Sequence, residues 1–199
     1  MRSDMSSVRA FLAIPLPWQL QESIRVIQTE LQAGIAEARW TRPENLHLTL
    51  HFFAKIEQET LEKLKVSVLS IKGFQRPFQV EVKGLGVFPN PHRPRVIWLG
   101  LEPRGQLKQL HRATGQCLRQ AGVAIDSRPY SPHLTIGRLR GGKLDLPRLF
   151  SSMQQKTIAP LTVDRLVLYE SRLRPEGAQH VPLLTVNFDD ENTDTHDAT

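Results

Sequence analysis

Arg42-Pro-Glu-Asn-Leu-His-Leu-Thr-Leu50 returns later in the chain as Arg128-Pro-Tyr-Ser-Pro-His-Leu-Thr-Ile136. The two segments align without a gap at an offset of 86 residues, and five of the nine positions are identical. The helices and strands expected around the two copies also follow in a similar order. An internal repeat of this kind predicts a duplicated fold in which each half places its copy at an equivalent position.

The His-x-Thr triplet inside each copy has a simple meaning on a β-strand. Side chains two positions apart point to the same face of a strand. His47 and Thr49 therefore share one face, and His133 and Thr135 share another. The apolar side chains between and around them point the other way, into the core: Leu46, Leu48, Leu50, Leu134 and Ile136. If the halves are related by a two-fold, the four polar groups converge on one cleft.

These residue types suit phosphoryl chemistry. A histidine titrates near pH 6.5, so one ring can take a proton from water while another delivers one to a leaving alkoxide. A threonine hydroxyl donates a hydrogen bond to a phosphate oxygen. This set suffices to hydrolyse a strained cyclic phosphate without a metal. A single His-x-Thr triplet would indicate a structural histidine, but two copies in matching frames favour catalysis.

A metal site is the alternative interpretation of these histidines. His47 and His51 are expected on one strand face, but no carboxylate or cysteine stands at ligand spacing beside either motif. Cys117 is the only cysteine, which excludes a disulfide framework or a cysteine-based zinc site within one chain. We expect no metal and no other cofactor.

The remaining pattern predicts an α+β domain over residues 8–188, with disordered tails at 1–7 and 189–199. Apolar periodicity predicts a helix that Pro17 opens and Gly34 ends. Three further helices are expected at Glu57–Ile71, Leu107–Gln120 and Leu146–Met153. Strands are expected at Val8–Ile14, Leu46–Phe53, Phe78–Val87, Val96–Leu101, Ser131–Leu139, Leu161–Glu170 and Val181–Phe188.

Charge is unevenly distributed along the chain. The formal net charge is +6, but five acidic residues lie beyond residue 186, so residues 1–186 carry +11. Such a balance fits either a well-solvated surface or a polyanionic partner such as nucleic acid. No apolar run approaches the roughly 20 residues of a membrane span, and no signal pattern opens the chain. We expect a cytoplasmic monomer.

The paired triplets His47-Leu-Thr49 and His133-Leu-Thr135 resemble those of the two-histidine (2H) phosphoesterase superfamily. The flanking segments resemble the bacterial and archaeal RNA 2′,3′-cyclic phosphodiesterases, the ThpR or LigT-like family. The similarity runs from about Arg9 to Phe188. The segments that carry it are Arg9–Pro17, Trp40–Phe53, Gly84–Pro89, Arg93–Trp98, Pro132–Arg138 and Leu166–Arg172.

This resemblance implies a bilobal fold with a V-shaped cleft between two antiparallel sheets and helices packed outside. It implies hydrolysis of RNA 2′,3′-cyclic phosphate ends to a 2′-phosphate, with tRNA fragments as one candidate substrate. His47 would be the general acid toward the 3′ oxygen, and His133 the general base. Thr49 and Thr135 would bind phosphate oxygens, and Arg138 would add a charge-assisted contact. The near-symmetric repeat alone does not order the two histidines, and Arg138 could instead be a solvated strand-end residue.

Residues around the two motifs have no single assignment from the sequence. The family usually continues its first motif with Phe-Leu-Gly, where this chain has Phe52-Phe-Ala-Lys55. The alternation places His51 on the side of the strand that faces the site, where it either lines the cleft or is solvated. Phe88, Trp98 and Tyr130 could stack on a terminal base, although we expect Trp98 in the core. The other histidines, His92, His111, His180 and His196, receive no role.

Three other functions remain open at this point. The same site could join tRNA halves through a 2′–5′ linkage, the reverse of ring opening, although dilute water favours hydrolysis. A basic RNA-binding module without catalysis would explain the charge but not the paired motifs. Another two-histidine esterase acting on a small nucleotide would share every catalytic residue, and only a comparison of substrates separates it from the first reading.

Overall fold

The computed structural model describes residues 7–35, 38–71, 76–139, 157–175 and 177–188. The helix predicted at Leu146–Met153 and both predicted tails, except for Ser7, lie outside these ranges. Within them the helical elements are α1 (Trp18–Gln32), the short 3₁₀ helix η1 (Pro43–Asn45), α2 (Gln58–Leu69) and α3 (Arg104–Gln120). The strands are β1 (Ser7–Pro15), β2 (Ala38–Trp40), β3 (His47–Glu57), β4 (Phe78–Phe88), β5 (Val96–Glu102), β6 (His133–Leu139), β7 (Thr157–Val163), β8 (Arg165–Arg174) and β9 (Gly177–Asn187).

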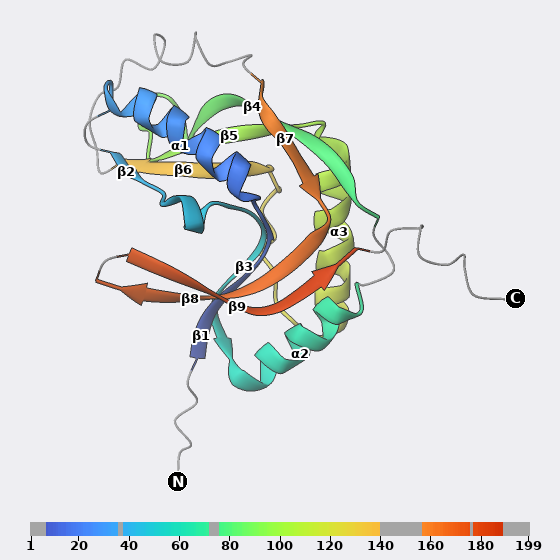
Figure 1. Cartoon of the computed structure of the whole chain (residues 1–199). Coiled ribbons are helices and arrows are strands. Elements are labelled where there is room, and N and C mark those ends of the chain that lie inside the picture. The colour runs from blue at the N-terminus through green and yellow to red at the C-terminus, as the bar shows by residue number, and fades with distance from the viewer. Residues whose placement is uncertain (1–6, 36–37, 72–75, 140–156, 176, 189–199) are drawn as a thin grey trace, which may run out of the picture.

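The strands form two sheets, each built from antiparallel pairs. Sheet A has the order β3-β1-β8-β9, and sheet B has the order β2-β6-β5-β4-β7. Helices pack against the sheets rather than forming parallel crossovers within them (Figure 1). The α+β class and the two antiparallel sheets predicted from the sequence are therefore confirmed.

Apart from β2, the strands of the two sheets correspond position by position. Reading β3-β1-β8-β9 against β6-β5-β4-β7 places the two histidine-bearing strands, β3 and β6, at equivalent positions. The units β1-α1-β3 and β5-α3-β6 correspond as well. However, β4 comes from the first half of the chain and completes sheet B, whereas β8 and β9 come from the second half and complete sheet A. Each sheet thus draws strands from both halves.

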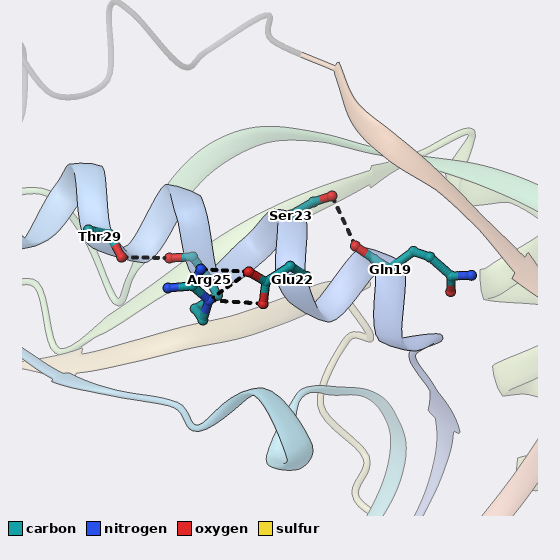
Figure 2. A network of polar contacts seen from close by, with 5 residues as sticks. All are labelled: Gln19, Glu22, Ser23, Arg25 and Thr29. Atoms are coloured by element: carbon teal, nitrogen blue, oxygen red, sulfur yellow. Dashed lines mark hydrogen bonds and ion pairs between the residues drawn. The ribbon is translucent and has the colours of Figure 1, made fainter.

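Helix α1 shows why the chain folds this way locally. Pro17 precedes it in an extended conformation, and its buried apolar side chains repeat at helical spacing: Leu20, Ile24, Ile27 and Leu31. This stripe packs against sheet B, through β6 and β7. The outward face carries polar contacts along the helix, including the Arg25–Glu22 ion pair and the bond from the Ser23 hydroxyl to the Gln19 carbonyl (Figure 2).

The other two helices cover the opposite sheet. Helix α2 and helix α3 pack against each other and against β3 of sheet A. Helices α1 and α3 each follow a strand of one sheet yet pack on the other sheet, because α1 leaves β1 of sheet A and α3 leaves β5 of sheet B. Buried side chains from both sheets and all three helices join one continuous apolar cluster. This packing brings β3 and β6 into contact although they belong to different sheets.

One predicted strand is wrong. The segment Leu161–Glu170 is not continuous: β7 ends at Val163, and β8 begins at Arg165 in the other sheet. Apolar residues resume at once after the break because both flanking strands are buried, so only Asp164 and Arg165 mark it. Its carbonyl accepts a hydrogen bond from the Phe188 amide at 2.7 Å, which fixes the corner between the sheets.

Other predicted elements are present with bounds that shift by up to a few residues. Strand β2 and the 3₁₀ turn η1 were not predicted, because three residues are too few to show a period. Among the described residues, none of the helices has both the length and the apolar composition that crossing a membrane requires.

Candidate active site

A cleft of about 740 Å³ opens where strands of both sheets meet. All five residues predicted for the site line it: His47 and Thr49 from β3, and His133, Thr135 and Arg138 from β6. The structure therefore brings together groups that stand 86 residues apart in the chain. This convergence follows from the equivalent positions of β3 and β6 in their sheets and from the contact between them.

A β-bulge in β3 decides which side chains face this cleft. Consecutive residues of β1 pair with His51 and Thr49, which leaves Leu50 as an extra residue in β3. A bulge of this kind shifts the alternation of faces by one position. Beyond it, Phe52 joins the cleft lining and His51 turns to the core side, where its side chain is 4% exposed. The prediction that His51 shares the face of the site is therefore wrong.

Strand β6 carries the same bulge at the equivalent position. Consecutive residues of β5 pair with Gly137 and Thr135, which leaves Ile136 as the extra residue. Without the bulge, strict alternation would turn Arg138 away from His133 and Thr135. With it, all three side chains line the cleft. The bulge thus supplies the local reason that Arg138 reaches the site.

The bulge in β6 is held by a buried glutamine of α1. The side-chain amide of Gln28 donates hydrogen bonds of 2.8 Å to the carbonyls of Ile136 and Thr41. The Thr41 amide also donates to the Ile136 carbonyl, at 2.9 Å. Thr41 immediately precedes the first motif and Ile136 lies in the second, so these bonds tie the two copies together.

Both catalytic candidates hold the same tautomer. His47 donates from Nδ1 to the Asn45 carbonyl at 2.8 Å, and His133 donates from Nδ1 to the Ser131 carbonyl at 2.7 Å. A carbonyl only accepts, so Nδ1 carries the proton in each neutral ring. The Nε2 atom of each histidine is then left with a free lone pair. Each ring can accept a proton at Nε2 or, once charged, donate one from it.

The ring of His47 lies in a largely apolar, aromatic setting. It stacks on Phe11 with ring centroids 4.5 Å apart and meets the edge of His180 at 5.1 Å. Burial lowers the pKa of His47 to about 4, and the nearby positive charges of His180, His133 and Arg138 act in the same direction. The hydrogen bond to Asn45 opposes this shift. At neutral pH His47 is therefore uncharged in the free protein.

His133 has a comparable aromatic neighbourhood from sheet B. Phe88 meets its ring edge-on at 4.9 Å, and the Trp98 ring lies 6.4 Å away. Burial also lowers the pKa of His133. Trp98 pairs across from Thr135 and is only half-buried, so the prediction that it belongs to the core is wrong. Gly86 makes room for it, because an added Cβ there would overlap the indole ring.

Tyr130 connects the two motifs in a way the sequence did not reveal. It stands three residues before His133, and its hydroxyl donates to the carbonyl of Thr49 at 3.2 Å. Its ring stacks on His111 with centroids 4.1 Å apart, and His111 in turn stacks on His51 at 4.4 Å. Tyr130 therefore positions backbone rather than facing the cleft. The repeat offered no signal for this bond, because the first copy has Glu44 at the equivalent position.

Sequence reasoning missed His180, which it left without a role. His180 lies on β9 opposite Ser171 of β8, and both line the cleft beside His47. Its position depends on the register of the β8–β9 hairpin, which no motif in the sequence specifies.

The electrostatics of the cleft are one-sided. Five arginines line it: Arg9, Arg39, Arg42, Arg138 and Arg174. The described residues of the lining include no Asp or Glu. Such a cleft attracts anions. In the part of the chain that the structure describes, no group of three or more His, Cys, Asp or Glu residues could hold a metal ion.

Comparison with known proteins agrees with this geometry. The model of the family described as LigT-like phosphoesterase matches the chain twice, at residues 14–98 and 99–178, once for each half. The RNA 2′,3′-cyclic phosphodiesterase of Methanothermobacter thermautotrophicus is 35% identical over 173 residues, covering 85% of this chain and 93% of the relative. The protein of the same name from Aquifex aeolicus is 30% identical, over 92% of this chain and 96% of the relative.

Solved structures show the same fold. The structure of TT0787 from Thermus thermophilus superimposes with a TM-score of 0.75 at 25% identity, covering 90% of this chain and 97% of that one. Escherichia coli LigT complexed with 3′-AMP gives a TM-score of 0.72 at 25% identity, over 93% and 100% of the two chains. The family model spans both halves and a relative at 35% identity matches most of the chain, so this protein belongs to the LigT-like family of two-histidine phosphoesterases.

Proposed function

We propose that this protein hydrolyses the 2′,3′-cyclic phosphate at the end of an RNA and leaves a 2′-phosphate. The observation that carries the proposal is the matched pair of histidines, each with Nε2 free and each beside a threonine, in one cationic cleft. Relatives that carry the name RNA 2′,3′-cyclic phosphodiesterase support it over most of the chain.

The two histidines divide the proton transfers. Nε2 of His133 takes a proton from water as the water oxygen bonds to phosphorus. The bond from phosphorus to the 3′ oxygen then breaks, and Nε2 of His47 gives that oxygen a proton. Water enters and the alkoxide leaves on opposite sides of the phosphorus, which suits one ring from each sheet. The product keeps its phosphate on the 2′ oxygen.

His47 must gain a proton before it can act as the acid. Its pKa of about 4 leaves it neutral in the free protein at pH 7. A bound phosphate anion close to the ring would favour the imidazolium and raise this pKa. Substrate binding and protonation of His47 are thus coupled. The bound phosphate favours the charged His47 ring, which then protonates the 3′ oxygen.

Thr49, Thr135 and Arg138 hold the phosphate during this step. The two hydroxyls donate to the non-bridging oxygens from opposite sheets. The Arg138 guanidinium adds a charge-assisted contact where negative charge grows in the transition state. No metal takes part in this proposal, and the two histidines supply both proton transfers.

Product analysis tests the proposal directly. The purified protein is incubated in EDTA with adenosine 2′,3′-cyclic phosphate and with a short RNA ending in a cyclic phosphate. We expect a 2′-phosphate product, and we expect H47A and H133A each to lower kcat by about 10²–10⁴. The exposed His92, on a turn and outside the cleft lining, provides H92A as the matched control.

Two results would overturn the proposal. A 3′-phosphate product would reverse the direction of ring opening. No product from either substrate would leave an RNA-binding module or another phosphoester substrate. Use of tRNA fragments, a cytoplasmic location and a monomeric state remain predictions that this assay does not address.

A further inference from the structure

Two arginines face each other across one pair of strands at the cleft. Arg39 of β2 lies directly opposite Arg138 of β6 in the antiparallel register, and both line the cleft. Side chains at directly opposite positions share a face, with Cβ atoms roughly 4.5–5.5 Å apart, and like charges placed so repel each other. This pair opposes folding unless an anion lies between or beside the two guanidinium groups.

Nothing in the described part of the cleft neutralises these charges. Elsewhere in the described chain, arginines pair with nearby carboxylates: Arg25 with Glu22, Arg104 with Glu102, Arg128 with Asp126, Arg165 with Asp164 and Arg172 with Glu170. Neither Arg39, Arg138 nor Arg174 has such a partner among the described residues, whose cleft lining holds no carboxylate. These three positive charges are therefore available to a ligand.

Arg39 also reaches across the cleft to the other sheet. Its Nη2 atom lies 3.0 Å from where a Cβ on Gly177 would stand. Gly177 pairs with Arg174 at the tip of the β8–β9 hairpin, so a third guanidinium joins this end of the cleft. The Asn45 side chain donates to the Ala178 carbonyl at 2.9 Å and fixes the tip there. Figure 1 shows this tip on the same side of the molecule as β2 and η1.

The spacing along the sheet separates Arg39 from the catalytic groups. On β5, Trp98 pairs with Thr135 and Val96 pairs with Arg138, two residues further along. Two residues of strand span roughly 7 Å, so the backbone of Arg39 stands about one nucleotide step beyond Thr135. The charge of Arg138 acts on both His47 and His133, so Arg138 belongs with the catalytic groups. We infer that Arg39 and Arg174 form a second phosphate subsite, which binds the phosphate on the 5′ oxygen of the terminal nucleoside. This inference rests on the proposed function, in which the cyclic phosphate lies between the two histidines.

Through this subsite the enzyme would bind the phosphate that precedes the terminal nucleoside, one position upstream of the cyclic phosphate. Four substrates isolate that contact: adenosine 2′,3′-cyclic phosphate, the same nucleoside with a 5′-phosphate, the dinucleotide ApA ending in the cyclic phosphate, and that dinucleotide with an uncharged methylphosphonate linkage. Wild-type kcat/KM should be about five- to tenfold higher for the charged dinucleotide than for the methylphosphonate, through KM. R39Q and R174Q should each reduce this ratio toward one, whereas R112Q, on the exposed face of α3, should keep it.

The outcomes separate cleanly. A wild-type ratio of one, or a ratio that R39Q and R174Q leave unchanged, would overturn the subsite. Equal preference for the 5′-phosphorylated nucleoside and the charged dinucleotide would identify any 5′-phosphate as the ligand, and preference for the dinucleotide alone would identify the RNA linkage. If the wild type opens none of the substrates, the proposed function fails by itself. Binding of the two dinucleotides, measured by calorimetry, then still decides whether Arg39 senses the phosphate charge.

Discussion

The proton on His47 is the smallest feature that controls the proposed reaction. In the free protein the ring is neutral above about pH 4, because burial and neighbouring positive charges lower its pKa. Burial lowers the pKa of His133 as well. The reactive form, with His47 charged and His133 neutral, is then most populated below pH 6.5 and becomes scarce as the pH rises.

The pH dependence of kcat/KM and kcat should therefore differ. The profile of kcat/KM reports the free enzyme, so its alkaline limb should begin on the acid side of pH 6.5. The profile of kcat reports the bound state, where the phosphate anion raises the pKa of His47, so its alkaline limb should lie at higher pH. Steady-state rates on adenosine 2′,3′-cyclic phosphate from pH 4 to 9 measure both. Coincident limbs would refute the coupling between substrate binding and protonation.

The role of the Tyr130 hydroxyl in positioning the first motif can be tested by removing that one oxygen. Y130F removes the bond to the Thr49 carbonyl but keeps the ring stacked on His111. We expect kcat to fall about three- to tenfold with little change in KM, because a small shift between catalytic groups slows the chemical step more than binding. Y169F is the matched control, since it also removes a tyrosine hydroxyl and keeps the ring stacked on Phe11. A rise in KM with kcat unchanged would point to a different role for Tyr130.

At this scale the sequence predicted five polar residues that line the cleft and missed the groups that position them. His47, Thr49, His133 and Thr135 were predictable because a repeat displays them and strand geometry gives them a common face. Arg39 and His180 reach the cleft through cross-strand register, and the Tyr130 hydroxyl joins the two motifs through its bond to the Thr49 carbonyl. Those relations join residues that are remote in the chain, and no local pattern encodes them.

Among the elements, the bulged strand β6 controls the approach of Arg138. Gln28 holds the bulge through the carbonyls of Ile136 and Thr41, and its side chain is 5% exposed. Q28L keeps the volume but leaves the Thr41 carbonyl without this donor. We expect the free energy of unfolding to fall by about 1–3 kcal/mol, and kcat/KM to fall with it as Arg138 shifts.

Urea unfolding and steady-state kinetics on the same preparations test this expectation. Gln32, exposed on the last turn of the same helix, gives Q32L as the matched control. If Q28L matched Q32L in both measurements, the bulge would not depend on this side chain.

Element boundaries and periods explain the wrong predictions. Strict alternation assigned His51 to the cleft, and a one-residue bulge at Leu50 reversed that assignment. The same rule joined β7 and β8 into one strand, because apolar residues continue on both sides of Asp164. In each case the sequence period was real, but the backbone broke it at a point that only cross-strand pairing defines.

For the whole molecule, the buried histidines predict sensitivity to acid. Burial lowers the pKa of His51 to about 4, with the positive charges of His111 and Arg119 acting in the same direction. Its Nε2 donates to the Thr114 hydroxyl at 2.8 Å, deep between β3 and α3. The unfolded chain therefore binds more protons than the folded one between about pH 4 and pH 6.5. Stability is fully present above this window and is lost as the pH falls through it.

Thermal unfolding at several pH values measures this effect. Tm should fall as the pH is lowered from 7 to 4.5, and the fall should be shallower in H51Q, which keeps a donor but cannot titrate. H51Q should be less stable than the wild type at pH 7, because it loses the stack on His111. The comparison therefore uses the slope and not the value, with H92Q as control. Parallel slopes for wild type and H51Q would assign the acid loss to other groups.

The class of the whole fold was predictable because the mixture of periods specified α+β, the repeat indicated a duplication, and the family resemblance implied two antiparallel sheets. The exchange of strands between the halves was not. β4 in sheet B and β8–β9 in sheet A are placed by contacts between residues far apart in the chain, such as Ala10 opposite Glu170. A pattern of local periods cannot rank such pairings.

That exchange also sets the order of events during synthesis. When a growing chain has passed residue 139, both histidine motifs exist, yet β1 still lacks its partner β8, and the hairpin that carries His180 has not been made. Pairings this distant in sequence form late and slowly. A nascent chain on the ribosome therefore holds both motif histidines before the strands that complete their cleft exist. The lining of the cleft is complete only when β8 and β9 are in place, because Ser171, Arg174 and His180 come from these strands.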